Sequence, residues 1–355
     1  DNLGAAATTR ADELWVGGNS GLELTGEGYN QLGEWDAGNV RVSHQEFTDQ
    51  GPSRVTVMDG NHATHYHATH VAGTMVAAGI DNNAKGMLYG GNLKSWQWTS
   101  DESEMAAAAA NGLEISNHSY GFARGWDYVN GNWIWRGVAS ISPDEDYKFG
   151  FYDSGSKLWD QMAYNAPNYL IVKSAGNDRG EGPGNAGNGE PEKDGGDDGY
   201  DCISPRGVAK NIMTVGAVTE VLDYTEPDDV HMSSFSCWGP ADDGRIKPDI
   251  VGKGVDVFST SDGSNTSYQT LQGTSMSAPN VSGSMALLQH YYQETHNDEV
   301  MRASTLKGLV LHSADEAGEH EGPDYIFGWG LMNAERAAWI ISDDMSQNVI
   351  DELTL

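Results

Sequence analysis

The chain has 355 residues, with 52 acidic and 20 basic side chains and a formal net charge of −32 at pH 7. This length can bury a large core and lies near the upper limit for a single hydrophobic core. The negative charge repels phosphate backbones and anionic bilayers, which excludes nucleic acid and membrane surfaces as default partners. No apolar run is long enough for a transmembrane helix, and the start at Asp1, without Met or a leader pattern, predicts a processed chain.

Strand-like and helix-like segments alternate along most of the chain. Period-2 and period-3.6 patterns predict strands over 54–58, 92–96, 113–119, 169–173 and 211–218, and helices over 67–78, 102–111, 274–296 and 301–313. This alternation predicts an α/β fold with a mostly parallel central sheet and helices on both faces. The pattern continues past residue 300 without a linker, which favours one domain over residues 1–355.

Two segments interrupt this alternation. Residues 122–156 are rich in aromatic side chains and glycine, and residues 180–201 are rich in Gly, Asp and Glu. Both are too irregular for regular elements, so we expect surface insertions that carry specificity or bind ions.

A serine stands where the long helix begins, in Gly273-Thr-Ser275-Met-Ser-Ala-Pro279. The positive end of a helix dipole stabilises an anion, which suits a nucleophilic hydroxyl. Most serines at helix starts only cap the helix, so Ser275 taken alone leaves capping and catalysis both open.

Four histidines lie close together in His62-Ala-Thr-His65 and His67-Ala-Thr-His70-Val-Ala-Gly-Thr74. A histidine at the front of a helix of small residues protrudes, so it can act as a general base toward a hydroxyl from another segment. Neighbouring imidazoles can also bind zinc, but this spacing does not match His-Glu-x-x-His and no glutamate lies in the cluster.

Two further polar side chains follow strand-like runs. Asp36 lies in Gly33-Glu-Trp-Asp36-Ala-Gly38, at a strand end from which a carboxylate can fix the tautomer of a histidine. Asn177 lies in Ser174-Ala-Gly-Asn177, at the sheet edge where open α/β sheets place their ligands, and its amide could bind a developing oxyanion. Taken singly, each residue could simply shape a turn.

The four contexts occur in the order Asp, His, Asn, Ser, and together they resemble the subtilisin-like serine peptidases, the subtilase family. Since Val71-Ala-Gly-Thr74 follows the second histidine pair, the family pattern selects His67 rather than His62 as the base. One departure is Ala37, where the family usually has a hydroxyl residue after the aspartate. The resemblance spans roughly residues 25–340 and includes further matches at Lys247-Pro-Asp249, Val215-Gly-Ala217 and Phe327-Gly-Trp-Gly-Leu-Met-Asn333.

The resemblance implies a three-layer subtilisin-like fold and a secreted, monomeric endopeptidase of bacterial type that cleaves proteins or peptides without an organic cofactor. Ser275 would be the nucleophile and His67 the base, Asp36 would orient His67, and Asn177 with the Ser275 backbone N–H would hold the oxyanion. The substrate would pair as an added strand along residues 117–121. The residues implied in substrate binding are Asn117, Ser119, Tyr120, Gly121, Ala175, Gly176 and Ser204.

Two alternatives remain beside this reading. One is a binding protein with the subtilase fold that has lost activity, although all four catalytic positions carry competent side chains. The other is a metal-dependent hydrolase that uses the histidine cluster.

Subtilases commonly bind calcium, and hard oxygen ligands on a Gly-rich loop suit that ion. The sequence leaves a structural calcium site and a solvated acidic loop equally open at Glu190, Asp194, Asp197, Asp198 and Asp201.

The chain has two cysteines, Cys202 and Cys237. By the resemblance they border the pocket for the residue before the scissile bond, where we expect them to form a disulfide. The alternative is a pair of buried free thiols, which is usual in a reducing compartment.

Overall fold

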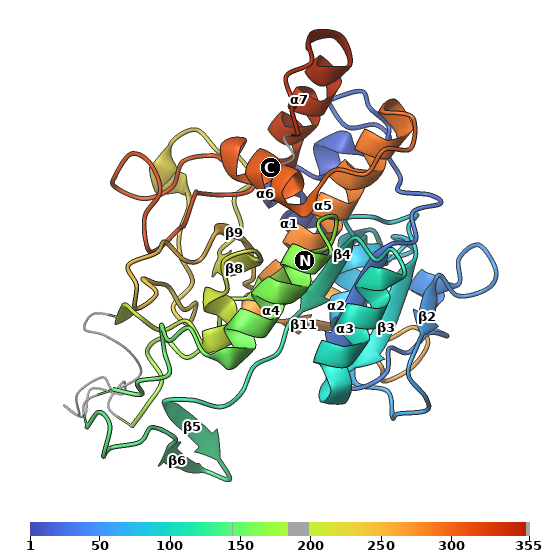
Figure 1. The fold of residues 1–355 in the computed structure, drawn as a ribbon. Helices are drawn as coiled ribbons and strands as arrows, with labels where there is room; N and C mark the ends of the chain where they lie inside the picture. Colours follow the sequence, from blue (N-terminus) through green and yellow to red (C-terminus); the bar gives the residue numbers. More distant parts are fainter. Residues whose placement is uncertain (144, 184–198, 353–355) are drawn as a thin grey trace.

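A sheet of seven strands forms the centre of the molecule, as Figure 1 shows for a computed structural model that describes residues 1–143, 145–183 and 199–352. The strand order is β2-β3-β1-β4-β7-β8-β9, and every neighbouring pair is parallel. This confirms the mostly parallel sheet expected from the sequence. The strands are β1 (Leu32–Asp36), β2 (Val55–Val57), β3 (Leu93–Gln97), β4 (Ile115–His118), β7 (Leu170–Ser174), β8 (Met213–Val218) and β9 (Ile250–Lys253).

Helices cover both faces of the sheet, which gives the three layers expected. One face carries α2 (Tyr66–Val76) and α5 (Thr274–Thr295), and the other carries α3 (Asp101–Ala110) and α4 (Ser154–Asn165). None of the helices in the described residues has the length and apolar character needed to cross a membrane. The remaining helices pack around α5 and are α1 (Asn2–Thr8), α6 (Ala303–His312) and α7 (Ala334–Gln347).

Side chains alternate between the two faces along each strand, so the sheet separates two buried clusters. Leu32 and Ile115 belong to the cluster under α2 and α5. Trp35 belongs to the cluster under α3 and α4, where it stacks on Trp96 with ring centroids 4.2 Å apart. Each large apolar side chain that is fully buried contributes about 1.5–3 kcal/mol to the stability of the fold.

The segment 122–156 contains regular structure that we did not expect. Strands β5 (Trp126–Val129) and β6 (Asn132–Trp135) form an antiparallel hairpin, which projects from the body of the molecule in Figure 1. Asn130 and Gly131 connect the strands with φ of 51° and 84°, the left-handed pair that a tight hairpin turn needs. A second hairpin, β10 (Val257–Thr260) and β11 (Tyr268–Leu271), packs on α2.

The order of the strands reverses between β1 and β4. After β1 the chain forms β2 at the edge of the sheet and then β3 between β2 and β1; it next crosses to β4 on the other side of β1 and continues in that direction. In open α/β sheets, such a switch point leaves a crevice at the carboxyl ends of the strands, where ligands bind. Asp36 ends β1 and Ser119 follows β4, so both lie at this crevice.

Candidate active site

Asp36 and His67 form a hydrogen-bonded pair at the carboxyl end of β1. His67 Nδ1 lies 2.8 Å from each carboxylate oxygen of Asp36, and the Asp36 side chain is fully buried. Ala37 stands where a hydroxyl residue is usual, and its backbone N–H donates to Asp36 Oδ1 at 2.6 Å. Burial lowers the pKa of His67, but the charge of Asp36 and its hydrogen bond outweigh this effect, so the pKa is raised overall.

Ser275 occupies the second position of α5, at the amino end of that helix. Its hydroxyl donates to the backbone carbonyl of Ser119 at 3.1 Å, and Ser119 Oγ donates to the carbonyl of Ser275 at 2.9 Å. These reciprocal bonds tie the start of α5 to the end of β4. In the described part of the chain, no hydrogen bond joins Ser275 to His67, and the serine hydroxyl is bonded to Ser119 instead.

Asn177 is held against the start of α5 by its amide oxygen, which accepts from the backbone N–H of Thr274 at 2.8 Å and from its hydroxyl at 2.9 Å. The amide NH2 therefore remains for a ligand beside Ser275. Gly273 adopts φ of +150°, and a Cβ there would lie 3.3 Å from Asn177 Nδ2. Thr274 was not among our candidates; its place between Gly273 and Ser275 in the serine motif was the available signal.

A pocket of about 280 Å³ lies beside Ser275 and Asn177. Tyr120, Gly121, Gly176 and Ser204, all expected to bind substrate, line it. Asn117, Ser119 and Ala175 were expected there too, but they are almost fully buried and do not line it. The lining also includes residues that sequence reasoning missed, namely Phe122, Ala123, Lys173, Ser174, Asp178, Glu181 and Thr274.

Three ionisable side chains in this pocket have pKa values displaced toward neutrality. Burial lowers the pKa of Lys173 to about 7, although the charge of Asp178 opposes the shift. Burial raises the pKa of Asp178 to about 6, and burial with the charge of Asp178 raises that of Glu181 to about 7. The charge of this pocket therefore changes over the physiological range of pH.

Cys202 and Cys237 are joined in a disulfide in this structure. The backbone N–H of Cys237 donates to the carbonyl of Gly176 at 2.9 Å, immediately before Asn177. A Cβ on Gly176 would lie 3.2 Å from Cys237 Sγ. The disulfide thus supports the segment that carries the candidate oxyanion donor.

Two of the other three histidines in the cluster each use one ring nitrogen in a hydrogen bond. His65 Nδ1 accepts from the backbone N–H of His67 at 3.2 Å, and His70 Nε2 lies 2.9 Å from the carbonyl of Val257. Burial lowers the pKa of His70 to about 3. The described residues contain no group of three or more His, Cys, Asp and Glu side chains placed to hold a metal ion.

The acidic loop expected to bind calcium falls largely outside the described residues, which exclude Glu190, Asp194, Asp197 and Asp198. Asp201 is described, and its Oδ1 is buried without a hydrogen-bond partner. Burial, with the charges of Asp242 and Glu145, raises the pKa of Asp201 to about 7.

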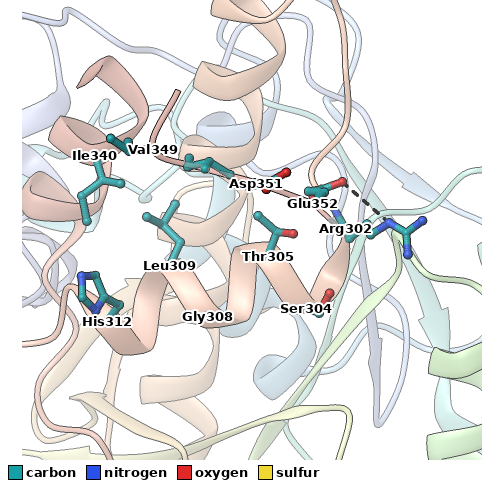
Figure 2. A pocket seen from close by; sticks show the side chains of 11 residues that line it. Arg302, Ser304, Thr305, Gly308, Leu309, His312, Ile340, Val349, Asp351 and Glu352 are labelled. Atoms are coloured by element: carbon teal, nitrogen blue, oxygen red, sulfur yellow. Dashed lines mark hydrogen bonds and ion pairs between the residues drawn. The ribbon is translucent and has the colours of Figure 1, made fainter. Parts of the chain in front are cut away.

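A second cavity, of about 370 Å³, lies between α6, α7 and the C-terminal segment (Figure 2). An ion pair at 3.7 Å joins Arg302 to Glu352 at one end. Ser304 and His312 lie near opposite ends of α6, about 12 Å apart at 1.5 Å per residue, which is too far for a nucleophile and its base. None of the four expected catalytic residues lines this cavity.

Comparison with solved structures places the fold among proteases of this architecture. The CspB protease of Clostridium perfringens superposes with a TM-score of 0.68 at 16% sequence identity, over 95% of this chain and 99% of that one. At this identity the similarity establishes the fold alone.

A sequence profile of the subtilase family matches residues 36–330, and the chain belongs to this family of serine proteases. Pyrolysin of Pyrococcus furiosus is 29% identical over 334 residues, which cover 82% of this chain and 22% of pyrolysin. C5a peptidase of Streptococcus pyogenes serotype M3 is 35% identical over 136 residues, 37% of this chain and 11% of that peptidase. The chain thus spans a small part of the length of these relatives.

Proposed function

We propose that this protein is a serine endopeptidase in which Ser275, His67 and Asp36 form the catalytic triad and Asn177 contributes to the oxyanion hole. The observation that carries the proposal is the buried Asp36 carboxylate, 2.8 Å from His67 Nδ1, at the same crevice as Ser275 on the amino end of α5. Because the carboxylate accepts the Nδ1 proton, Nε2 of the neutral ring is free to act as the base.

In the first half of the reaction, Ser275 Oγ bonds to the carbonyl carbon of the scissile peptide and gives its proton to His67 Nε2. Asn177 and the Ser275 backbone N–H stabilise the negative charge on the carbonyl oxygen. The C–N bond then breaks, and the departing amine takes the proton from His67. In the second half, water attacks the acyl carbon, its proton passes through His67 to Ser275 Oγ, and the product acid leaves.

The test is hydrolysis of a peptide amide by the wild type and by Ser275→Ala. We expect the variant to fold with an unchanged circular dichroism spectrum. Its activity should fall to the residual rate that substrate binding and the oxyanion hole supply without the nucleophile. A fluorophosphonate should label Ser275 in the wild type and no residue in the variant.

Each alternative predicts a different result. A metal-dependent hydrolase would keep its activity in Ser275→Ala and lose it to a zinc chelator. An inactive binding protein would neither cleave peptides nor react with the fluorophosphonate, although it folds normally. Either outcome would overturn the triad.

We further propose that proteins or peptides are the substrates, that the chain is secreted and monomeric, and that residues 1–355 form one catalytic domain that needs no organic cofactor. The disulfide between Cys202 and Cys237 supports an oxidising compartment. Cleavage of labelled peptide libraries tests the substrate class. Light scattering measures the oligomeric state, and thiol titration of the protein purified from its source tests the oxidising compartment.

A structural calcium ion near Asp201 is also part of the proposal. The unpartnered, buried Oδ1 of Asp201 supports a site completed by a cation, for which the described residues alone supply no group of three or more metal-ligating side chains. An ion that binds the folded protein stabilises it, so EGTA should lower the Tm, and added calcium should restore it. A Tm that EGTA does not change would contradict the proposed calcium site.

A further inference from the structure

Three polar side chains line one face of β4 and its continuation into the pocket. Ser116, His118 and Tyr120 alternate along the strand and lie on the side of α3 and α4. Ser116 and His118 are fully buried, which is unusual for polar groups in the middle of a parallel sheet. The catalytic steps above use none of their side chains.

These side chains belong to a continuous series of hydrogen bonds. Tyr169 OH lies 2.6 Å from Ser116 Oγ, which lies 2.8 Å from His118 Nε2. His118 Nδ1 lies 2.9 Å from Tyr120 OH, which donates to Asp101 Oδ2 at 2.7 Å. The series therefore runs from the buried Tyr169, just before β7, to the first residue of α3.

The donor and acceptor in each bond of the series follow from the bond at its end, between Tyr120 and Asp101. Tyr120 donates its single proton to Asp101 Oδ2, so its oxygen must accept from His118 Nδ1–H. The neutral imidazole then has a lone pair at Nε2, so Ser116 donates to it and accepts from Tyr169. Each hydroxyl and ring nitrogen in the series has a partner, and burial keeps the ring neutral because it lowers the pKa of His118 well below its usual value.

Aromatic rings fix the plane of His118. Trp35, next to the candidate triad aspartate in sequence, stacks on His118 with planes 13° apart, and the ring of Trp159 from α4 lies 5.0 Å away. Lys173 is the charged side chain whose field acts on this ring. The imidazole thus has one orientation in which both nitrogens are satisfied.

The opposite face of β4 connects to the nucleophile. Asn117 Nδ2 donates to Ser119 Oγ at 3.0 Å, and Ser119 Oγ donates to the carbonyl of Ser275. Tyr120, the next residue after Ser119, lines the pocket together with Ser275 and Asn177. A displacement of Tyr120 would therefore change both the pocket wall and the strand expected to pair with substrate.

We propose that His118 and Asp101 are positioning residues that hold Tyr120, and with it the substrate-binding segment after β4, in the geometry needed to bind peptide. This inference rests on the proposed peptidase function for its role in the reaction. The hydrogen-bonded series itself stands on the contacts alone. Asp101 does not line the pocket, so any effect of Asp101 on peptide affinity must be transmitted through Tyr120.

The kinetic test compares Tyr120→Phe, Asp101→Ala and the double variant with the wild type, on a peptide amide and with active-site-titrated enzyme. We expect each single variant to raise KM about three- to tenfold, the range of one hydrogen bond, and to change kcat less. Because Tyr120→Phe already removes the bond to Asp101, together with the bond from His118, the double variant should match Tyr120→Phe. Asp101→Asn keeps an acceptor and should restore most of the affinity.

Two controls separate positioning from a general loss of stability. Tyr164→Phe removes the hydroxyl of a tyrosine that is 82% exposed on α4, and it should leave KM unchanged. Asp101→Ala also removes an acidic residue from the first turn of α3, so its Tm should fall, whereas KM of the titrated, folded enzyme does not depend on Tm. Additive effects on KM, or a wild-type KM in Asp101→Ala, would overturn the proposal.

A second readout does not depend on catalysis. In ¹⁵N-histidine NMR, with the signal assigned by its loss in His118→Asn, His118 should be neutral and carry its proton on Nδ1 throughout the stable pH range. A proton on Nε2 would refute the series. If the wild type cleaves nothing, the peptidase proposal fails. The inference is then still decided by this spectrum and by the Kd of a peptide, measured for Tyr120→Phe and for Ser275→Ala, in which Tyr120 is unchanged.

Discussion

The hydrogen bond between Asp36 and His67 determines which imidazole nitrogen can take a proton from Ser275. With both carboxylate oxygens 2.8 Å from Nδ1, the neutral ring carries its proton there and leaves Nε2 as the base. The Ala37 backbone N–H gives the carboxylate a further donor, so the missing hydroxyl at position 37 does not leave Asp36 without support.

Asn177 should contribute to the rate rather than to affinity. Its amide oxygen is anchored by Thr274, so the NH2 group is fixed before substrate arrives and meets charge that develops only in the transition state. We expect Asn177→Ala to lower kcat by about 10²–10³ with little change in KM. Steady-state kinetics on a peptide amide measure both. A rise in KM at constant kcat would instead make Asn177 a ground-state contact.

Glu34 lies two residues before Asp36 on the same face of β1 and is fully buried. Ser95 Oγ donates to its Oε1 at 3.0 Å, and its Oε2 has no hydrogen-bond partner. Burial, with the charge of Asp36, raises the pKa of Glu34 well above its usual value, so the folded protein holds this proton to higher pH than the unfolded chain does.

The raised pKa makes stability depend on pH with a definite sign. Above the unfolded pKa, about 4.3, the unfolded chain releases the Glu34 proton while the folded chain keeps it, so this contribution to stability is lost as pH rises toward the folded pKa. Glu34→Gln cannot release a proton, so it should not lose stability in this way. Its free energy of unfolding, relative to that of the wild type, should therefore increase with pH, by up to about 1.4 kcal/mol per pH unit. Urea unfolding from pH 5 to 8 measures it, with exposed Glu27→Gln as control. Parallel curves for wild type and Glu34→Gln would contradict the assignment.

At the level of elements, the loop after β7 and the segment before the β5–β6 hairpin together shape the pocket. Phe122 and Ala123 come from the insertion, and Asp178 and Glu181 come from the turn that follows Asn177. The ring of Trp126 in β5 lies against Gly182, so the hairpin packs on the turn that carries Asp178 and Glu181. The insertion therefore contributes directly to the wall that a substrate side chain would meet.

The charge of this pocket should make side-chain preference depend on pH. Below about pH 6 its carboxyls are neutral and Lys173 is cationic; above about pH 7 Asp178 and Glu181 are anionic and Lys173 is neutral. The ratio of kcat/KM for peptides with Lys and with Glu before the scissile bond should thus rise from pH 5 to 8. About tenfold is expected, since one pair of unit charges at intermediate dielectric contributes on the order of 1–3 kcal/mol.

Titration of the triad changes kcat/KM equally for both peptides, so it does not affect the ratio of the two values. Glu181→Gln should flatten its dependence on pH, and Lys173→Met should remove the part due to the ammonium. A ratio that stays constant from pH 5 to 8 in the wild type would show that the pocket charges do not act on this side chain.

Most elements that position the site follow from local sequence patterns. The predicted helix 67–78 is α2 (Tyr66–Val76), and the predicted strand 169–173 is β7 (Leu170–Ser174). The β5–β6 hairpin carried a signal that was missed, because Asn130-Gly131 between two aromatic runs is typical of a two-residue turn. Helix α4 was also missed, since its polar and aromatic composition resembles the insertion that precedes it.

The four candidate catalytic residues could be predicted because each lies in a short motif at the end of an element. Of the pocket lining, Tyr120, Gly121, Gly176 and Ser204 were also expected, whereas the rest of the lining and the series from Tyr169 to Asp101 could not be predicted. They depend on side chains that meet from segments far apart in sequence, as Ser116 and Tyr169 do across 53 positions. No local pattern specifies which hydroxyls will meet across neighbouring strands.

At the level of the whole molecule, the charge of −32 should oppose the compact state. With 52 acidic and 20 basic side chains, ion pairs such as Lys247–Asp249 can neutralise only a minority of the carboxylates. The remaining negative charges repel one another in the fold more than in the expanded chain. Salt screens this repulsion, because the Debye length falls from about 10 Å at 0.1 M to about 3 Å at 1 M.

We therefore expect the Tm at pH 7 to rise as sodium chloride increases from about 0.05 to 1 M, by roughly 2–4 °C for each kcal/mol of repulsion relieved. Potassium chloride at equal ionic strength should give the same rise, since screening does not depend on the identity of a monovalent cation. The rise should shrink near the pI of 4.4, where protonated carboxyls have already removed most of the charge. A Tm that falls steadily with salt at pH 7 would mean that attractive ion pairs outweigh the repulsion, despite the large net charge.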